Sequence, residues 1–325
     1  DGSNYTHNEF GAAASVNGRV SQDRDFTTTL NAIQTLNYSN SFGAHRFKVD
    51  AIFESYNREN NLFDARGTGF LPNVRVLNGS TIPEGVGGAI NQERLMSAIT
   101  RVSYDYDNTY FAELSFRRDG SSKFSNDTRW GNFYSLGGSW ILSNTSFVET
   151  TDWIDYLKLK LSYGELGNNR GIGFFPYLQV FDTGYNQLDN TGVISSEFVD
   201  PNLTWEKTAL LNIGTEFTFF EGKLEGSIEY YNRESIDLIY DKPVALSTGN
   251  ESIKTNVGAV KNYGLEFSFN SLVLKKENLL VDLGLNFSFD RNEISDLTQE
   301  EFIEGDKKWM LGKSTRFLYQ SVCGS

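Results

Sequence analysis

Five glutamates on the polar faces of expected strands are the residues best placed to do acid–base chemistry: Glu113, Glu216, Glu225, Glu229 and Glu266. A glycoside hydrolase needs two carboxylates at a set separation, with their pKa values pushed apart. No pattern in this sequence singles out such a pair. The alternating segments around these glutamates instead favour charges that line water and pair with neighbouring strands. The sequence therefore predicts no catalytic residue and no enzyme.

The sequence lacks the groups of cysteine and histidine residues that metal sites and catalytic nucleophiles usually need. Cys323 is the single cysteine, which excludes an intrachain disulfide and a cysteine-based zinc site, and His7 and His45 are the two histidines. The segment from Asp182 to Asp189 gathers oxygen ligands without the spacing of a calcium loop, so a solvated loop is expected. Gly85–Gly88 lacks the Lys-Ser/Thr pair of a phosphate loop. We expect no metal site and no cofactor.

Composition excludes further classes. A formal net charge of −13 argues against a nucleic-acid binder, which would show a basic face. With 14% aromatic residues and 5 prolines in 325, the chain is not disordered. No apolar stretch approaches the roughly 18 residues of a membrane helix. What remains is an acidic, aromatic-rich β protein, and a membrane barrel is still allowed because its strands never produce a long apolar run.

Alternation of apolar and polar residues with a period of two is the dominant pattern, and it predicts ten strands. The segments are 7 to 11 residues long, whereas globular strands average roughly five or six. Long strands with one apolar and one charged face suit a wall between lipid and water, although a soluble sandwich would also alternate. The ten segments are 26–32, 47–53, 96–104, 110–116, 130–140, 157–163, 211–219, 224–230, 263–269 and 279–289.

Short and long connections alternate along the chain, as they do between the two rims of an outer-membrane barrel. This parity requires that segment 142–156, which is expected to carry a short helix, lies on the short-turn rim. The short connections are expected at 107–109, 220–222 and 271–278, and the long ones at 57–93, 165–206 and 233–256.

Aromatic residues crowd around the short turns, which favours a belt at a lipid interface over the core of a soluble sheet. They include Tyr104, Tyr106, Tyr110, Phe111, Phe217, Phe219, Phe220, Phe267 and Phe269.

Two polar motifs have both a functional and a structural interpretation. Arg117, Arg118 and Asp119 could contact substrate, but a turn is favoured in which Asp119 bonds the local backbone and Gly120 takes positive φ. Trp205–Glu206 could stack on a sugar and accept its hydroxyls, but a belt tryptophan on the outward face is favoured. The sequence thus leaves the substrate-binding residues unknown.

Six segments in a fixed order carry a resemblance to a known family. They are Arg117–Phe124, Arg129–Trp140, Leu157–Asn168, Pro201–Thr208, Tyr230–Ile239 and Asn256–Glu266. Together they resemble the barrel of the SusC/RagA family of TonB-dependent outer-membrane transporters, over roughly residues 90–320.

The resemblance implies an all-β fold, a transmembrane antiparallel β-barrel of about 22 strands. Residues 1–325 would then be part of that barrel in the bacterial outer membrane, in contact with membrane lipid. The family also has a plug domain, a TonB box and a SusD-like lipoprotein that captures glycans or peptides. Neither plug, TonB box nor a closing C-terminal strand is found here, and both ends, including the strand-like start of 317–325, are expected to be cuts in a longer chain.

The expected function is TonB-dependent import of oligosaccharides or peptides with a SusD-like lipoprotein, without nucleic acid as a partner. One alternative is a TonB-dependent transporter for a metal chelate or cobalamin that has no lipoprotein lid. The other is a secreted soluble β protein acting as a carbohydrate-binding module or adhesin, which predicts a complete, water-soluble chain of 36.6 kDa.

Overall fold

The computed structural model describes residues 2–149, 151–185, 187–188, 190–195, 198–297, 301–304 and 307–314. Asp189 and the segment 317–325, which contains Cys323, lie outside the described residues. Within the described part, no helix is long and apolar enough to cross a membrane.

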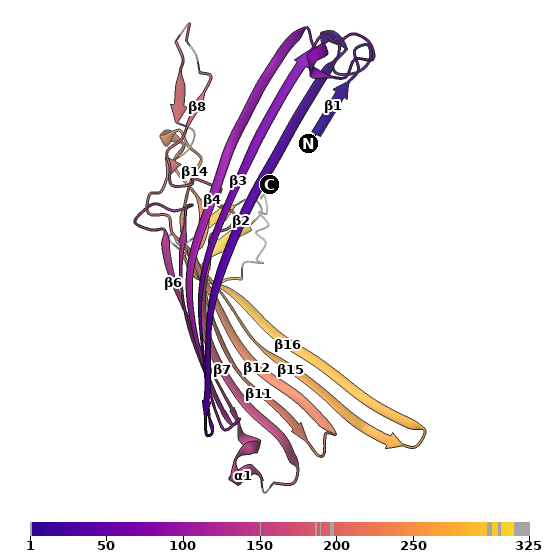
Figure 1. Cartoon of the computed structure of the whole chain (residues 1–325), viewed down its shortest axis with the longest axis vertical. Coiled ribbons are helices and arrows are strands. Elements are labelled where there is room, and N and C mark those ends of the chain that lie inside the picture. Colours follow the sequence, from indigo (N-terminus) through magenta and orange to yellow (C-terminus); the bar gives the residue numbers. More distant parts are fainter. Residues whose placement is uncertain are drawn as a thin grey trace, which may run out of the picture. The chain divides into compact units, whose positions relative to one another are not determined.

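One sheet of 11 strands contains all ten predicted strands and adds β1, which the sequence did not indicate. Its strands follow one another in chain order, as in a meander (Figure 1). Pairing is antiparallel from β1 to β2 and throughout from β5 to β16. The strands are β1 (Gly2–Thr6), β2 (Arg19–Phe42), β3 (His45–Thr68), β4 (Ile82–Tyr106), β5 (Tyr110–Ser121), β6 (Trp130–Ile141), β7 (Ile154–Asn168), β11 (Glu206–Phe219), β12 (Leu224–Ile236), β15 (Ala259–Lys276) and β16 (Leu279–Asp296).

The connections carry short elements of their own. Segment 142–156 holds the predicted helix, as the 3-10 turn η3 (Leu142–Asn144) and α1 (Ser146–Glu149). The other strands are β8 (Phe181–Thr183), β9 (Val193–Ser195), β10 (Phe198–Val199), β13 (Ile239–Pro243), β14 (Ser252–Asn256), β17 (Glu301–Glu304) and β18 (Lys307–Met310), and the other 3-10 turns are η1 (Ala14–Val16), η2 (Leu77–Gly79) and η4 (Leu246–Thr248).

The prediction that segment 142–156 lies on the short-turn rim is confirmed, because Asn144 Nδ2 donates to the Asn108 carbonyl at 3.0 Å, but two predicted extents are wrong. β15 and β16 continue through 271–278, with a bulge between Leu272 and Leu274, and leave only residues 277–278 as the turn. Segment 57–93 is mostly strand, because β3 runs to Thr68 and β4 starts at Ile82. Apolar alternation fades where water reaches both faces of a strand, so the sequence pattern ends before the hydrogen-bonded ladder does.

Neighbouring short turns are joined by backbone hydrogen bonds. The Asp107 amide donates to the Ala44 carbonyl at 2.8 Å, and the Phe220 amide donates to the Trp153 carbonyl at 2.9 Å. Asp107 has a φ of 53° and Phe220 of 59°, the left-handed geometry of tight turns. These bonds hold the short-turn edge as one continuous rim.

The chain divides into two compact units, of residues 1–33 with 54–96 and of residues 34–53 with 97–325. The first unit has a small core that contains the buried side chains of Val20 and Phe70. The Phe70 amide donates to the Asn17 carbonyl at 2.8 Å and so joins the β3–β4 loop to the residues before β2. This core holds the long connections of the first unit together.

An ion pair between Arg19 and Glu84 adds a pH-sensitive contact to the first unit. Arg19 Nε donates to Glu84 Oε2 at 2.6 Å. In the membrane barrel that the sequence predicts, both residues would lie beyond the hydrocarbon, because β2 is 24 residues long and β4 is 25, whereas roughly 9–11 residues cross it. The hydrogen bond from Arg19 is the largest effect and holds the pKa of Glu84 below its ordinary value; burial, which raises the pKa, comes next, and the charge of Arg19 lowers it further.

We expect the first unit to loosen in acid. Because the pKa of Glu84 is lowered in the folded state, its contribution is complete above the ordinary glutamate pKa and disappears as the pH falls through the lowered pKa. Amide hydrogen exchange of β2 and β4 near this pair should therefore accelerate in that acid range. In Glu84→Gln the acceleration should be absent, and an unchanged pH profile in this variant would contradict the assignment.

Candidate functional site

The strands of the second unit sort their side chains onto two faces. Residues directly opposite each other on paired strands point to the same side of the sheet. Leu114 lies opposite Leu136, and Glu113 lies opposite Gly137. We call the apolar side the outer face and the polar side the inner face. The outer face includes Leu114, Leu136, Leu161, Ile213, Leu265 and Phe287, and the inner face includes Glu113, Ser135, Ser162, Asn212, Glu229, Glu266 and Asn286.

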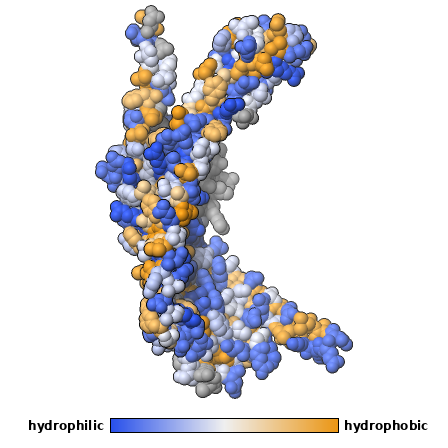
Figure 2. Space-filling model, viewed as in Figure 1, coloured by the Kyte–Doolittle hydropathy of each residue, from blue (hydrophilic) through white to orange (hydrophobic). Residues whose placement is uncertain are grey.

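The outer face leaves large apolar side chains uncovered. Leu136 is 58% exposed and Leu161 is 52% exposed. Figure 2 shows hydrophobic residues along the margin of the view where β6 and β7 lie, with hydrophilic residues beside them. Soluble proteins rarely expose contiguous apolar surface on this scale, whereas a lipid bilayer covers it. The outer face is therefore the lipid-facing surface of the wall.

Aromatic rings on the outer face line the short-turn edge, as predicted, except for Phe111, which lies opposite Ser139 on the inner face. Phe47 and Tyr104 have centroids 4.7 Å apart, and Tyr110 and Trp140 have centroids 5.9 Å apart. Another series runs through Trp153, Phe219, Phe217, Phe269, Phe267 and Phe287. Rings with polar edges are favoured where hydrocarbon meets water, so this belt marks one membrane interface.

Both histidines take part in local contacts. His45 Nδ1 lies 2.8 Å from the Tyr104 hydroxyl, and its ring stacks on Phe42 within the aromatic belt. His7 Nδ1 accepts a hydrogen bond from the Glu9 amide at 3.0 Å. These contacts give the histidines packing and turn-forming roles.

The inner face carries a charge network centred on Lys160. Its Nζ lies 3.1 Å from Glu216 Oε1 and 2.7 Å from Glu229 Oε2. Gly214 is the residue opposite Lys160 on β11, and a Cβ there would meet Lys160 Cε at 2.8 Å. The glycine therefore leaves the space through which the lysine stem reaches both carboxylates.

The predicted pairing of the glutamates across strands is confirmed for three of them. Besides Glu216 and Glu229, Glu113 accepts a hydrogen bond from Ser103 Oγ at 3.1 Å and lies 3.6 Å from Arg101 Nε. Glu266 lies directly opposite Glu229, and Glu225 lies opposite Asn270. Like charges opposite each other repel, so Lys160 offsets repulsion at this point of the wall.

We expect Lys160→Met to destabilise the barrel by about 1 kcal/mol, because it leaves Glu216 and Glu229 without their shared cation. Unfolding of the complete receptor in lipid vesicles would measure this loss. Lys223→Met is the matched control, since the Lys223–Glu221 pair is far more exposed and should contribute almost nothing. Equal effects of the two substitutions would contradict a special role for Lys160.

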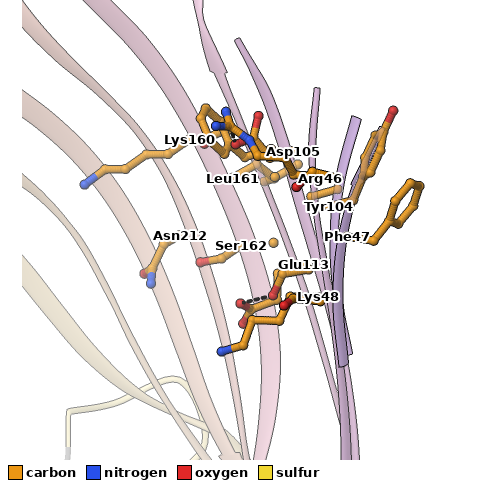
Figure 3. Close-up of a pocket in the computed structure, with 18 of the residues that line it drawn as sticks. Arg46, Phe47, Lys48, Tyr104, Asp105, Glu113, Lys160, Leu161, Ser162 and Asn212 are labelled. Atoms are coloured by element: carbon orange, nitrogen blue, oxygen red, sulfur yellow. Dashed lines mark hydrogen bonds and ion pairs between the residues drawn. The ribbon is translucent and has the colours of Figure 1, made fainter. Parts of the chain in front are cut away.

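A hollow of about 660 Å³ lies beside this network on the second unit. Its polar lining includes Lys48, Glu113, Lys160, Ser162 and Asn212, from four strands. A Cβ at Gly137, also in the lining, would meet no atom within 4 Å, so the missing side chain deepens the wall there. Figure 3 shows Lys48, Glu113, Ser162 and Asn212 on one side of the ribbons, with Phe47 and Tyr104 on the other.

The inner face offers hydroxyl, amide and paired ionic groups to water and to polar solutes. Within the described ranges, no group of three or more His, Cys, Asp or Glu is placed to hold a metal ion. Gly85–Gly88 lies within strand β4 rather than in a loop, and Asp182 lies in β8. The arrangement is suited to a hydrated passage.

The predicted turn at Arg117–Gly120 is wrong. These residues belong to strand β5, and Gly120 is absent from the positive-φ glycines of the described residues. Arg117 Nε donates to both oxygens of the buried Asp119 carboxylate, at 2.8 and 2.7 Å. Glycine is required at 120 because a Cβ would lie 2.7 Å from the Trp130 ring, over which Arg118 also stacks. Side-chain packing, not turn geometry, explains the motif.

Trp205 is not the outward belt residue that was expected. It is 3% exposed, its ring packs against Phe124 and Phe133, and its Nε1 donates to the Arg129 carbonyl at 2.9 Å. Glu206 accepts from the Ile239 amide at 2.8 Å. Neither side chain is free to bind a sugar.

Hydrogen bonds join three long loops around Trp205, and the sequence did not indicate the other residues that make these bonds. Asn256 Nδ2 donates to the Thr204 carbonyl at 3.0 Å and to the Asp237 carbonyl at 2.8 Å. The Thr204 amide donates in return to Asn256 Oδ1 at 2.8 Å. We call the residues 122–129, 200–206, 237–239 and Asn256 the loop collar. One feature of the sequence could have indicated the loop collar: Pro201–Thr208 and Asn256–Glu266 both belong to the segments that carried the family resemblance.

Comparison with known proteins identifies the family of this sheet, which has an apolar outer face and a polar inner face. Residues 1–315 match the family model described as "TonB dependent receptor-like, beta-barrel". The chain belongs to this family. It is therefore part of an outer-membrane β-barrel receptor and not an enzyme, which removes the soluble-module alternative.

Two curated relatives and one solved structure illustrate the likeness. The chain is 33% identical over 210 residues to TonB-dependent receptor P39 of Formosa agariphila, covering 65% of this chain and 20% of the relative. It is 30% identical over 296 residues to TonB-dependent receptor SusC of Bacteroides thetaiotaomicron, covering 88% and 29%. The RagAB peptide importer in its closed-closed state superposes with a TM-score of 0.80 at 25% identity, covering 91% and 33%. The chain thus spans about a fifth to a third of the length of these proteins.

Proposed function

We propose that this chain forms part of the wall of a TonB-dependent importer that carries oligosaccharides or peptides across the outer membrane together with a SusD-like surface lipoprotein. The observation that carries the proposal is the likeness to SusC over 88% of the chain, on a sheet with an apolar outer and a polar inner face. RagAB, a peptide importer, supports the peptide class of cargo.

Residues 1–325 would contribute one section of a barrel of about 22 strands. β1 and β16 are the edges of the sheet, and unpaired backbone groups are costly in lipid. Further strands of the complete receptor would pair with these edges and close the wall. A plug domain would fill the lumen against the inner face, and TonB would act on the plug through its TonB box.

Uptake by living cells tests the proposal. A strain that lacks the complete receptor gene would be supplied with labelled oligosaccharides, labelled peptides and labelled metal chelates. We expect loss of oligosaccharide or peptide uptake, restoration by the intact gene, and sensitivity to a protonophore because TonB draws on the inner-membrane proton gradient. Loss confined to metal chelates would overturn the proposal in favour of a chelate transporter.

A further inference from the structure

The hairpin of β8 and β9 exposes apolar side chains that the described residues do not cover. Phe181 is 60% exposed, Val193 58% and Ile194 49%. Figure 1 shows this hairpin extending away from β6 and β7, and Figure 2 shows hydrophobic residues along it. A two-stranded hairpin is marginally stable alone in water and needs a surface to pack against. Its apolar side chains therefore suit an interface.

The tip of the hairpin presents two further apolar anchors. Tyr185 is 59% exposed, and Leu188 is 93% exposed with a φ of 54°. A bulky residue rarely adopts the left-handed region, and such strain is concentrated at functional sites. A leucine held there with its side chain in water is costly for the free protein and fits an anchor that is buried in a complex.

The base of the hairpin is anchored to the loop collar. β10 follows β9 and pairs with β14, which ends at Asn256 of the collar. Thr255 Oγ1 of β14 donates to the Asp200 carboxylate, and the Asn202 amide donates to the same side chain at 2.9 Å. A pre-organised base reduces the entropy lost when the hairpin binds a partner.

The charge of this loop restricts the partner. The loop between β7 and β11, residues 169–205, contains one cation, Arg170, and four carboxylates: Asp182, Asp189, Glu197 and Asp200. A second copy would present the same acidic surface and be repelled. A protein face with Lys or Arg around an apolar pocket would be attracted.

Position excludes lipid as the surface that covers the hairpin. β7 is 15 residues long, runs from the short-turn edge with its aromatic belt, and needs only roughly 9–11 residues to cross the hydrocarbon. β8 begins at Phe181, beyond the end of β7 at Asn168. The hairpin therefore lies outside the bilayer on the long-loop side.

We propose that the β8–β9 hairpin is a docking element for the surface lipoprotein, with Tyr185 and Leu188 entering an apolar pocket ringed by basic residues of that protein. This inference rests on the proposed function, which supplies the partner. The apolar side chains provide affinity, and the carboxylates favour this partner over an acidic one.

The test uses the complete receptor purified in detergent and the lipoprotein that co-purifies with it, identified by its lipid-modified N-terminus. After separation, the dissociation constant is measured with purified lipoprotein for the unmodified receptor and for the Tyr185→Ser, Leu188→Ser double variant. We expect the double variant to bind at least about tenfold more weakly. Leu71→Ser, at a residue 71% exposed in the first unit, is the matched control and should bind as the unmodified receptor does.

A charge variant tests the second half of the inference. Asp182→Lys should weaken binding and reduce its dependence on salt, because one attractive charge is reversed. Unchanged affinity of both hairpin variants overturns the inference while leaving the proposed function intact. A change only in self-association would also overturn it and would assign the hairpin to contacts with a second copy. A change only in folding of the barrel would overturn it as well and would assign the hairpin to contacts with other loops of the receptor. Absence of any lipoprotein with the unmodified receptor overturns the proposed partnership itself.

Discussion

Replacing Trp205 with alanine is expected to destabilise the loop collar by about 3–5 kcal/mol, the range for removing a large buried aromatic side chain. Trp205 is 3% exposed, and its loss would leave a cavity between Phe124 and Phe133. It would also leave the Arg129 carbonyl without its indole donor. Proteolysis of the long loops in intact cells should therefore become much faster, and urea unfolding of the complete receptor in vesicles should shift to lower concentration.

Two controls separate the collar from a general effect of tryptophan removal. Trp205→Phe retains most of the ring and should recover most of the protease resistance while losing the hydrogen bond to Arg129. Trp153→Ala removes a ring that is 48% exposed in the aromatic belt and should leave the loops resistant. Equal protease sensitivity of Trp205→Ala and Trp153→Ala would contradict the interpretation that Trp205 holds the loop collar together.

Placing an arginine on the outer face should destabilise the barrel by about 2–4 kcal/mol near the bilayer midplane. Leu161 is a suitable position, because it is 52% exposed and lies between Gly138 and Ile213 on the neighbouring strands. Lipid cannot hydrate the new charge, so Leu161→Arg should lower the unfolding free energy of the complete receptor in vesicles.

The adjacent residue provides the control for the arginine substitution. Ser162 lies on the inner face and lines the hollow, so Ser162→Arg places the same charge in a hydrated setting. We expect it to change stability much less than Leu161→Arg. If Ser162→Arg were the more damaging of the two, the assignment of outer and inner faces would be reversed.

The sequence alone was enough to predict the wall. Period-two alternation assigned Leu161 and Ser162 to opposite faces, because successive residues of any strand point to opposite sides. It also located the turn at Asp107–Thr109 and the helix within 142–156, where the alternation stops. These features depend on residues close together in the chain, so local pattern determines them.

Only the tertiary structure decided what the polar motifs do. Arg117 and Asp119 resembled a turn, yet they form an ion pair inside a strand. Trp205 resembled a belt residue, yet it is buried against Phe124 of another loop and Phe133 of strand β6. In each case a contact with a residue distant in sequence contributes, because Arg117 Nη2 also donates to Ser97 Oγ on β4 and Trp205 packs on Phe124. Such contacts follow from which strands and loops meet, and alternation along a single strand contains no information about that meeting.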